Sequence, residues 1–285
     1  MKDVTNAMRA HILTAAVPYI KQYTDQYVVV KYGGNAMIDE ELKKSVMKDL
    51  MLLQLVGVKV VLVHGGGPAI NSTLDAMKIE SHFANGLRVT DEATMDVVQM
   101  VLAGKVNKGL VADLTDLGGK AVGLCGVDGN MIQVHKQNDE LGYVGSIDTI
   151  DTSIIDDVIS RGYTPVISSI GMGADGKTYN INADTVAAKI AGALKAETMV
   201  AMTNIDGVLR DVHDPSSLIS KITMAEADQL KAEGIIAGGM IPKVDCCLEA
   251  IKSGAQKVFI INGEIPHAIL IELLTDEGLG TMFVK

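Results

Sequence analysis

Two glycine-rich segments contain residue types that could bind an anion. The segment VVVKYGG carries Lys31, Gly33 and Gly34, and the segment VLVHGGGP carries Gly66 and Gly67. Glycine lets backbone N–H groups approach a ligand closely, and a helix that begins at the second segment adds partial positive charge. Either segment alone also fits a tight turn, with Lys31 as a solvated residue. Two such segments on consecutive predicted strands favour an anion site.

Three further charged residues lie near predicted helix starts. Arg88 precedes a helix and could bind a carboxylate through two parallel hydrogen bonds, or pair with a surface acid. Lys243 follows a glycine pair and taken alone fits an exposed helix lysine, while Asp184 could be only a helix N-cap. His64 fits a core or turn histidine, and we assign it no proton chemistry. The spacing of Ser, His, Cys, Asp and Glu predicts neither a nucleophilic triad nor a metal site.

One segment matches two nucleotide-binding patterns, and we favour a β-turn over both. Residues 171–178, GMGADGKT, satisfy the P-loop pattern GxxxxGK[ST] and also GxGxxG. Both patterns require a helix to begin at the loop, whereas residues 178–182 alternate like a strand. Asp175 would also place a carboxylate in the phosphate cradle. The segment therefore predicts a β-turn with Lys177 on its surface.

Composition excludes several classes of function. The chain has 285 residues with 48% hydrophobic and 21% charged residues, which excludes global disorder. A net charge of −10 argues against binding to nucleic acid or to an anionic membrane. No apolar run approaches the ~18 residues of a membrane span. Three cysteines without a CxxC pattern predict neither a disulfide framework nor a zinc site, and fit the cytoplasm.

Strand and helix patterns alternate from residue 27 onward, which predicts an α/β fold with a largely parallel sheet covered on both faces. We expect strands at 27–31, 58–63, 144–149, 164–170, 198–203, 217–222, 257–262 and 281–284, and a hairpin near 121–136. We expect helices at about 40–56, from Pro68 onward, and at 91–103, 105–117, 151–161, 183–194, 223–233, 241–253 and 266–274. Residues 27–285 form one predicted domain with lobes of about 27–190 and 191–285.

The extension 1–26 precedes the first strand. Residues 4–23 predict an amphipathic helix, bent near Pro18, with Met8, Ile12, Ala16 and Tyr19 on its apolar face. Such a helix is marginal in water unless that face is covered, and a second copy of the helix is the simplest cover.

The chain resembles the amino acid kinase family. The matching segments lie in family order along nearly the whole chain: VVVKYGGNAM, VVLVHGGGPAIN, NGLRVT, YNINADTVA, TNIDGVL, GGMIPKV and TDEGLGTMF. The resemblance implies a three-layer αβα sandwich around a mainly parallel, twisted sheet. It also implies that the turn before YNINAD is a β-hairpin. The combination of HGGG, GLRVT and YNINAD resembles the branch of the family that acts on N-acetyl-L-glutamate.

The resemblance also implies a reaction and a site. ATP would phosphorylate the side-chain carboxylate of N-acetyl-L-glutamate, the second step of arginine biosynthesis, with Mg²⁺ bridging the nucleotide phosphates. The implied catalytic residues are Lys31 and Lys243, which would contact the transferred phosphoryl group, and Asp184, which would hold those lysines. The implied acetylglutamate contacts are Gly66, Gly67, Arg88 and Asn180. The implied nucleotide contacts are Gly33, Gly34, Asn204, Gly207 and Met240.

An N-terminal helix also has a meaning within the family. Its arginine-inhibited members carry such a helix, which joins dimers into a hexamer. The resemblance therefore implies a homohexamer inhibited by arginine, with His267 and Glu277 as candidate effector contacts. Three alternatives stay open: a sister kinase acting on another acyl amino acid, a P-loop NTPase using Lys177, and an amino-acid sensor without turnover.

Overall fold

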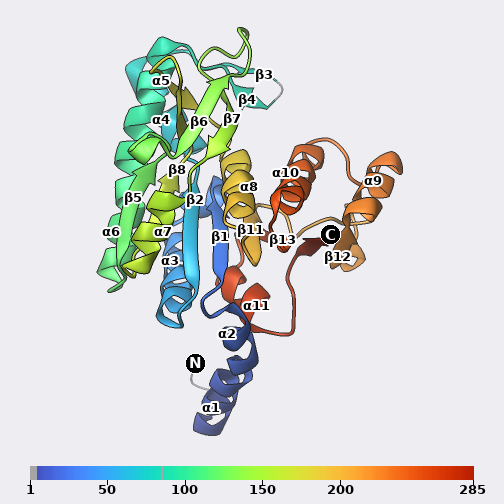
Figure 1. The fold of residues 1–285 in the computed structure, drawn as a ribbon. Coiled ribbons are helices and arrows are strands. Elements are labelled where there is room, and N and C mark those ends of the chain that lie inside the picture. The colour runs from blue at the N-terminus through green and yellow to red at the C-terminus, as the bar shows by residue number, and fades with distance from the viewer. Residues whose placement is uncertain (1–4, 85) are drawn as a thin grey trace.

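An eight-stranded sheet forms the centre of the computed structural model, which describes residues 5–84 and 86–285 (Figure 1). The strand order is β12-β14-β13-β11-β1-β2-β8-β5, and all neighbours are parallel except β13 and β14. The strands are β1 Tyr27–Tyr32, β2 Lys59–His64, β5 Ala121–Cys125, β8 Thr164–Ser168, β11 Thr198–Thr203, β12 Lys221–Thr223, β13 Lys257–Asn262 and β14 Thr281–Val284.

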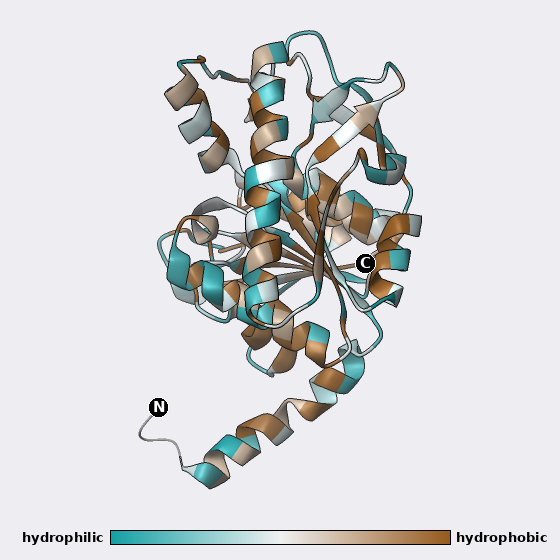
Figure 2. Ribbon diagram, turned by 90° about the vertical axis from the view of Figure 1, so that its left-hand side faces the viewer, coloured by the Kyte–Doolittle hydropathy of each residue, from teal (hydrophilic) through white to brown (hydrophobic). Residues whose placement is uncertain are grey.

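The central strands form because they are β-branched runs that can be buried on both faces. Val28 and Val30 in β1 point into one apolar cluster, and Val29 between them points into the other. The strands are accordingly coloured brown in the middle of the molecule (Figure 2). The same alternation directs Lys31 toward the layer of Val29, and His64 toward the layer of Val28 and Val30.

Helices cover both faces of this sheet, which confirms the predicted three-layer sandwich. One layer contains α2 Val17–Tyr23, α3 Glu40–Leu55, α6 Asn107–Asp116 and α11 Ala268–Leu274. The other contains α7 Ser153–Ser160, α8 Ala183–Ala193, α9 Met224–Ala232 and α10 Met240–Ser253.

A second structural unit, here called the hood, lies over the carboxyl ends of β1, β2 and β8 (Figure 1). It contains a four-stranded sheet in the order β10-β9-β6-β7, a two-stranded sheet and two helices. Its elements are α4 Gly67–Met77, β3 Phe83–Ala84, β4 Leu87–Arg88, α5 Glu92–Gln99, β6 Ile132–Lys136, β7 Gly145–Ile150, β9 Ile170–Gly173 and β10 Thr178–Asn180.

The predicted hairpin at 121–136 is wrong. Strand β5 pairs in parallel with β8 in the large sheet, whereas β6 pairs with β7 and β9 in the hood. The chain changes sheets at Gly126, where a Cβ atom would lie 2.4 Å from Ile132 Cβ. The predicted strand 164–170 divides in the same way between β8 and β9. Alternation of residue types predicts strands but does not identify their partners.

Three other predicted elements have different bounds. The helices expected at 91–103 and 105–117 are one continuous segment, because a π-helix over Met100–Val106 joins α5 to α6. The strand expected at 217–222 is the shorter β12, preceded by a 3-10 turn at Pro215–Ser217.

The N-terminal segment forms two helices with different surroundings. Helix α1, Asn6–Ala15, ends just before Pro18, near the predicted bend, and extends away from the sheet (Figure 1). Tyr19 and Tyr23 of α2 pack into the apolar layer beside β1, whereas α1 has no buried residue among those described. Within residues 5–84 and 86–285, none of the helices combines the length and the apolar character that a membrane span needs.

Candidate active site

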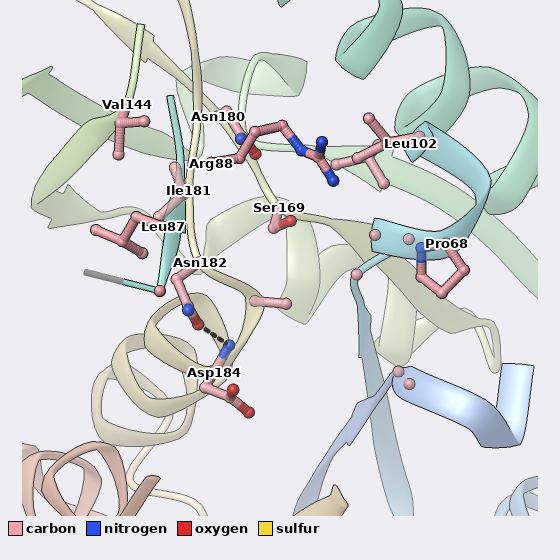
Figure 3. A pocket seen from close by; sticks show the side chains of 18 of the residues that line it. Pro68, Leu87, Arg88, Leu102, Val144, Ser169, Asn180, Ile181, Asn182 and Asp184 are labelled. Atoms are coloured by element: carbon pink, nitrogen blue, oxygen red, sulfur yellow. Dashed lines mark hydrogen bonds between the residues drawn. The ribbon is translucent and has the colours of Figure 1, made fainter. Parts of the chain in front are cut away.

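A cavity of about 330 Å³ lies between the carboxyl ends of β1 and β2 and the hood (Figure 3). Ligands of parallel α/β sheets bind at this edge. The cavity gathers eight of the predicted site residues, from both glycine segments, β4, β10 and α8. They are Lys31, Gly33, Gly34, Gly66, Gly67, Arg88, Asn180 and Asp184.

The second glycine segment ends β2 and begins α4. Gly66 is the N-cap residue of α4, and Pro68 occupies the first turn, where its missing N–H is no loss. A Cβ atom on Gly66 would lie 2.6 Å from Leu102 Cδ2, so only glycine fits without a shift. The N–H groups of the first helical turn have no partner within the helix. Gly66 and Gly67 line the cavity, so their N–H groups can bind an anion there.

Lys31 lies at the carboxyl end of β1 and is 9% exposed. Its Nζ forms an ion pair of 3.0 Å with Asp184 Oδ1, in the first turn of α8. Asn182 is the N-cap of α8 and accepts hydrogen bonds from the backbone N–H groups of Asp184 and Thr185. The alternative in which Asp184 itself caps the helix is therefore wrong, and its carboxylate is free to orient Lys31.

Arg88 is 7% exposed and lies at the opposite end of the cavity from Asp184 (Figure 3). Its guanidinium donates hydrogen bonds to Ser81 Oγ and, at 2.7 Å, to Asn71 Oδ1, and lies over the Phe83 ring. Burial lowers the pKa of Arg88, and no described carboxylate lies within ion-pair distance of it. Arginine stays charged in proteins, so the cavity holds a buried cation without an anionic partner.

Asn180 is the last residue of β10, beside Arg88 in the cavity. Its Nδ2 donates a 3.3 Å hydrogen bond to Thr90 Oγ1, which donates to the Arg88 carbonyl. Two of the four predicted substrate contacts, Arg88 and Asn180, are thus connected through Thr90.

The turn that precedes β10 is not a phosphate-binding loop. Strands β9 and β10 form an antiparallel pair, with Gly173 and Lys177 bonded across the turn. Lys177 is exposed and donates to the Tyr143 hydroxyl, outside the cavity. The predicted β-turn is therefore confirmed, because a strand and not a helix follows this loop.

A second cavity of about 570 Å³ adjoins the first and contains Lys243. Lys243 lies in the first turn of α10, and Asp184 and Asn182 line both cavities. Lys189 also lines the second cavity and pairs with Glu249 at 2.6 Å, which ties α8 to α10. Asp184 thus pairs with Lys31 of the sheet in the first cavity and also lines the second cavity, together with Lys243 of α10.

The structure does not bring the predicted nucleotide residues Asn204, Gly207 and Met240 into these two cavities. Asn204 is exposed after β11, and Met240 begins α10. Gly207 is buried with φ +147°, and a Cβ atom there would lie 2.5 Å from Thr281 Oγ1. A structural requirement therefore suffices to explain the glycine.

Of the two candidate effector residues, His267 lies beside α3, on the opposite side of the sheet from α8. His267 Nδ1 is 2.6 Å from Asp49 Oδ1, and the His267 backbone N–H donates to Ser45 Oγ. Burial raises the pKa of Asp49 to about 6. Glu277 is exposed in the loop before β14, and its backbone N–H donates to Thr275 Oγ1.

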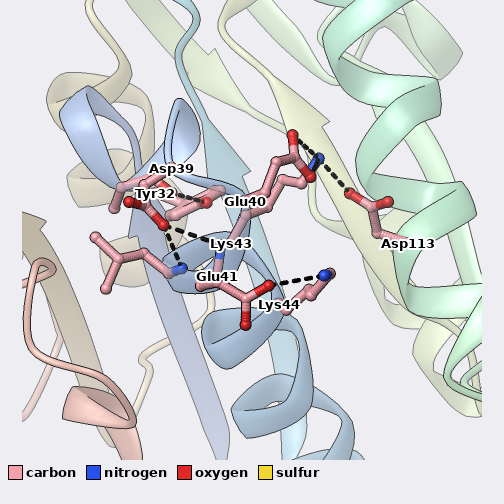
Figure 4. A network of polar contacts seen from close by, with 9 residues as sticks. Tyr32, Asp39, Glu40, Glu41, Lys43, Lys44 and Asp113 are labelled. Carbon is pink, nitrogen blue, oxygen red and sulfur yellow. Dashed lines mark hydrogen bonds and ion pairs between the residues drawn. The ribbon is translucent and has the colours of Figure 1, made fainter.

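Polar contacts brace the chain after the first glycine segment (Figure 4). The Tyr32 hydroxyl donates to the carbonyl of Ala36, and Asp39 caps α3 by accepting from two backbone N–H groups. Lys43 of α3 pairs with Asp113 of α6 at 3.4 Å. Gly34, at φ +73°, therefore lies between a buried strand and a firmly capped helix.

Several site residues were not predicted from the sequence. Asn71 and Ser81 hold Arg88, and Asn182 caps α8. Asn71 lies one helical turn after Gly67, so helical spacing could have placed it near the glycine segment. Ser81 lies in a short loop with no comparable signal.

The fold and site define a class of protein: residues 26–262 match the amino acid kinase family, and the chain belongs to it. Together with relatives that are about 50% identical and are named as kinases, this membership makes the chain a kinase and implies ATP use. Several relatives are named acetylglutamate kinase, and two of them show the extent of the match. That of Brachyspira hyodysenteriae is 51% identical over the full length of both chains. That of Clostridium kluyveri is 54% identical over 96% of this chain and 97% of its own.

Solved structures agree on the fold. The N-acetylglutamate synthase of Neisseria gonorrhoeae, complexed with coenzyme A and N-acetyl-glutamate, has a TM-score of 0.84 at 27% identity. The match covers 97% of this chain and 63% of the synthase chain. The carbamate kinase of Giardia lamblia, at 17% identity and a TM-score of 0.65, shares the fold alone.

Proposed function

We propose that this protein is an acetylglutamate kinase. It transfers the γ-phosphoryl group of ATP to the side-chain carboxylate of N-acetyl-L-glutamate, forming N-acetyl-L-glutamyl 5-phosphate in the second step of arginine biosynthesis. The observation that carries the proposal is Arg88, a buried cation without a carboxylate partner, facing a cavity lined by a helix N-terminus. Relatives named acetylglutamate kinase, which are about 50% identical over nearly the full chain, support the same substrate.

Two kinds of contact bind the acceptor. Arg88 and Asn180 bind its α-carboxylate at one end of the cavity, and the backbone N–H groups of Gly66 and Gly67 bind at the start of α4. Lys31 then lies near the side-chain carboxylate that reacts. The 330 Å³ cavity has room for an amino-acid-sized ligand.

The reaction needs positioning and charge compensation more than proton transfer. One carboxylate oxygen forms a bond to the γ-phosphorus while the bond from that phosphorus to the β–γ bridging oxygen breaks, and ADP leaves. The nucleophile is already ionised, so it requires no general base. Lys31 and Lys243 stabilise the charge that spreads over the transferred group, and Asp184 orients them.

The nucleotide extends from the first cavity into the second. Gly33 and Gly34 offer backbone contacts to its phosphates, and we keep Asn204, Gly207 and Met240 as contacts to the rest of the nucleotide. We expect Mg²⁺ on the phosphates. No group of three or more His, Cys, Asp or Glu side chains in the described residues could hold a metal, and one carboxylate, Asp184, lines both cavities. That donor set suits an ion held mainly by phosphates and water, which would neutralise phosphate charge when bound.

We further propose that arginine inhibits the enzyme and that α1 joins subunits into a hexamer. Met8, Ile12 and Leu13 of α1 are 56%, 58% and 73% exposed, so an apolar surface is left for a partner helix. His267 and Glu277 stay candidate arginine contacts. A biosynthetic enzyme with three free cysteines fits the cytoplasm.

A coupled assay of ADP release tests the function directly. The purified protein is offered ATP with N-acetyl-L-glutamate, with free glutamate, and with the acetyl derivatives of aspartate and ornithine. We expect turnover with N-acetyl-L-glutamate to exceed the others by orders of magnitude. Equal or higher turnover with another acceptor would identify a sister kinase instead.

A further inference from the structure

His64 is a fully buried histidine that the mechanism above leaves without a role. It is the last residue of β2 and directly precedes the glycine segment that lines the cavity. Its ring lies on the face of the sheet covered by α6, opposite the layer of Lys31 and Asp184. The ring therefore touches the loop from behind and not from the cavity.

Asn107 determines which ring nitrogen carries the proton. Its Nδ2 lies 2.8 Å from the Val166 carbonyl oxygen, 3.3 Å from that of Leu124 and 3.0 Å from His64 Nε2. The opposite amide orientation would place Oδ1 against two carbonyl oxygens, which can only accept. The amide nitrogen therefore faces the ring, its two hydrogens serve three acceptors, and His64 Nε2 accepts.

The remaining ring nitrogen then donates to the loop. Nδ1 carries the proton and lies 2.9 Å from the carbonyl oxygen of Gly65. The Gly65 backbone N–H donates to the Tyr32 carbonyl at 3.1 Å. Gly65 is thus held by two hydrogen bonds. Its N–H group donates to β1, and its C=O group accepts from the His64 ring.

This hydrogen bond sets the orientation of the next N–H group. The Gly65 carbonyl and the Gly66 N–H belong to one planar trans peptide unit, in which they point in opposite directions. A carbonyl held toward the buried ring therefore turns the Gly66 N–H away from the ring, toward the cavity that Gly66 lines.

The surroundings keep the ring neutral. A charged ring would place an Nε2–H against the amide hydrogens of Asn107, and burial lowers the pKa of His64 to about 4. Glycine at position 123 leaves room for the Asn107 amide. A Cβ atom at this position would lie 1.8 Å from Asn107 Oδ1.

We propose that His64 is a positioning residue, which aims the Gly66 N–H at the bound acceptor, and that Asn107 fixes its tautomer. The identity of the acceptor rests on the proposed function, whereas the hydrogen-bond arrangement does not.

Two substitutions at His64 distinguish the roles of the two ring nitrogens. In His64→Asn the amide nitrogen lies near the position of Nδ1 and can donate to the Gly65 carbonyl. In His64→Gln the terminal amide lies nearer Nε2 and leaves that carbonyl unpaired. We expect His64→Gln to raise the KM for acetylglutamate about tenfold while changing the KM for ATP less than about twofold. We expect His64→Asn to raise the acetylglutamate KM less than about threefold.

Val61→Ala is the matched control, because it opens space in the same strand without touching the loop. We expect it to lower the melting temperature without a selective rise in the acetylglutamate KM. Equal effects of His64→Asn and His64→Gln, or the same KM pattern in Val61→Ala, would overturn the proposal.

A measurement on the unaltered protein needs no variant to fold. Nitrogen-15 NMR of histidine-labelled, deuterated protein at neutral pH should show His64 protonated on Nδ1 alone. A ring protonated on Nε2, or charged, would also overturn the proposal. If the protein does not phosphorylate acetylglutamate, the proposed function is wrong, and the variants are compared on the acceptor that it does use.

Discussion

At the scale of single residues, the two buried cations of the first cavity differ in how their charge is compensated. Lys31 has a carboxylate partner 3.0 Å away, whereas Arg88 has neutral oxygens and an aromatic ring. A lysine that is paired with a carboxylate is held in one position, where it can stabilise the negative charge that develops during the reaction. A guanidinium without an anion gains most from a ligand that brings one. The two residues therefore suit different parts of a phosphoryl transfer.

Replacement of Lys31 by alanine tests its role in that transfer. We expect Lys31→Ala to lower kcat by about 10²–10³, because it removes a preorganised charge contact from the transferred group. Lys177→Ala is the matched control, since Lys177 is an exposed lysine of the hood outside the cavity. It should leave kcat within a few-fold. Steady-state kinetics would contradict the assignment if Lys177→Ala lowered kcat by this amount and Lys31→Ala did not.

Replacement of Arg88 by lysine tests recognition of the acceptor. Lysine keeps the charge but loses the planar fork that binds a carboxylate through two hydrogen bonds. We expect the KM for acetylglutamate to rise roughly 10–100-fold, as for a lost charge-assisted hydrogen bond, while the KM for ATP changes little. A parallel rise in both KM values would show that Arg88 does not distinguish the substrates.

His64 also makes a prediction about stability and pH. Its pKa falls from 6.5 in the unfolded chain to about 4 in the fold, so the unfolded state binds more protons between these values. The free energy of unfolding should therefore fall as pH decreases through this window, by roughly 3 kcal/mol from this group. Asp49, with a pKa raised to about 6, acts in the opposite direction over a similar window.

The two contributions are separated by a difference measurement. Urea unfolding of the native chain and of His64→Gln is compared from pH 7 to pH 4. The native chain should lose more stability over this range than the variant. Identical pH dependence in both proteins would show that His64 is not the group that titrates.

At the scale of secondary structure, strands were predictable where burial alone determines them. The valines of β1 and β2 are buried on both faces, and the glycines that follow them begin the site. The change of sheet at Gly126 was not predictable, because it depends on contacts with Ile132 and Ile170. The π-helix before Asn107 likewise has no signal in the period of the apolar residues.

The site was predictable to a similar extent. Lys31 was predicted from its place beside a glycine segment, and its pairing with Asp184 was implied only by the family resemblance; the structure brings the two together. The partners of Arg88 were missed, because Asn71 and Ser81 come from different parts of the hood and meet only through tertiary packing. Gly207 shows the converse, since a glycine within a family motif can be explained by close packing alone.

The N-cap of α8 connects stability of an element to the reaction. Asn182→Ala removes an oxygen that accepts from two backbone N–H groups, and should lower the free energy of unfolding by about 1 kcal/mol. It should also lower kcat, because the freed first turn no longer holds Asp184 against Lys31. Asp39→Ala removes an equivalent cap from α3 and should cost similar stability with kcat retained. Equal kcat values in the two variants would show that the Asn182 cap has no role in catalysis.

At the scale of the whole molecule, one sheet carries both predicted lobes. Strands β1, β2, β5 and β8 come from residues 27–190, and β11 to β14 from residues 191–285. The two cavities meet at Asp184 on α8, which lies close to the boundary between these halves. We propose that the first half binds the acceptor and the second binds the nucleotide. A net charge of −10 leaves local cations and helix N-termini to hold both anions.

The N-terminal segment divides between the subunit core and a surface. Tyr23 is 3% exposed and α2 packs beside β1, so removing residues 1–24 would damage the core. Deletion of residues 1–15 removes α1 alone. If α1 joins subunits, the shortened enzyme should be a dimer with kcat retained and with much weaker inhibition by arginine. Light scattering gives the mass, and an arginine titration gives the inhibition.

A substitution separates loss of the helix from loss of its apolar surface. Ile12→Glu with Leu13→Glu keeps α1 in place but charges two of its most exposed apolar side chains. Burial of both charges against a partner helix would be costly, so this variant should dissociate like the deletion. Arginine can act through the assembly only if it binds one arrangement more tightly than another, so both variants should lose inhibition together. A charged variant that stays hexameric, or full-length enzyme that arginine leaves active, would refute the role of α1 without affecting the kinase assignment.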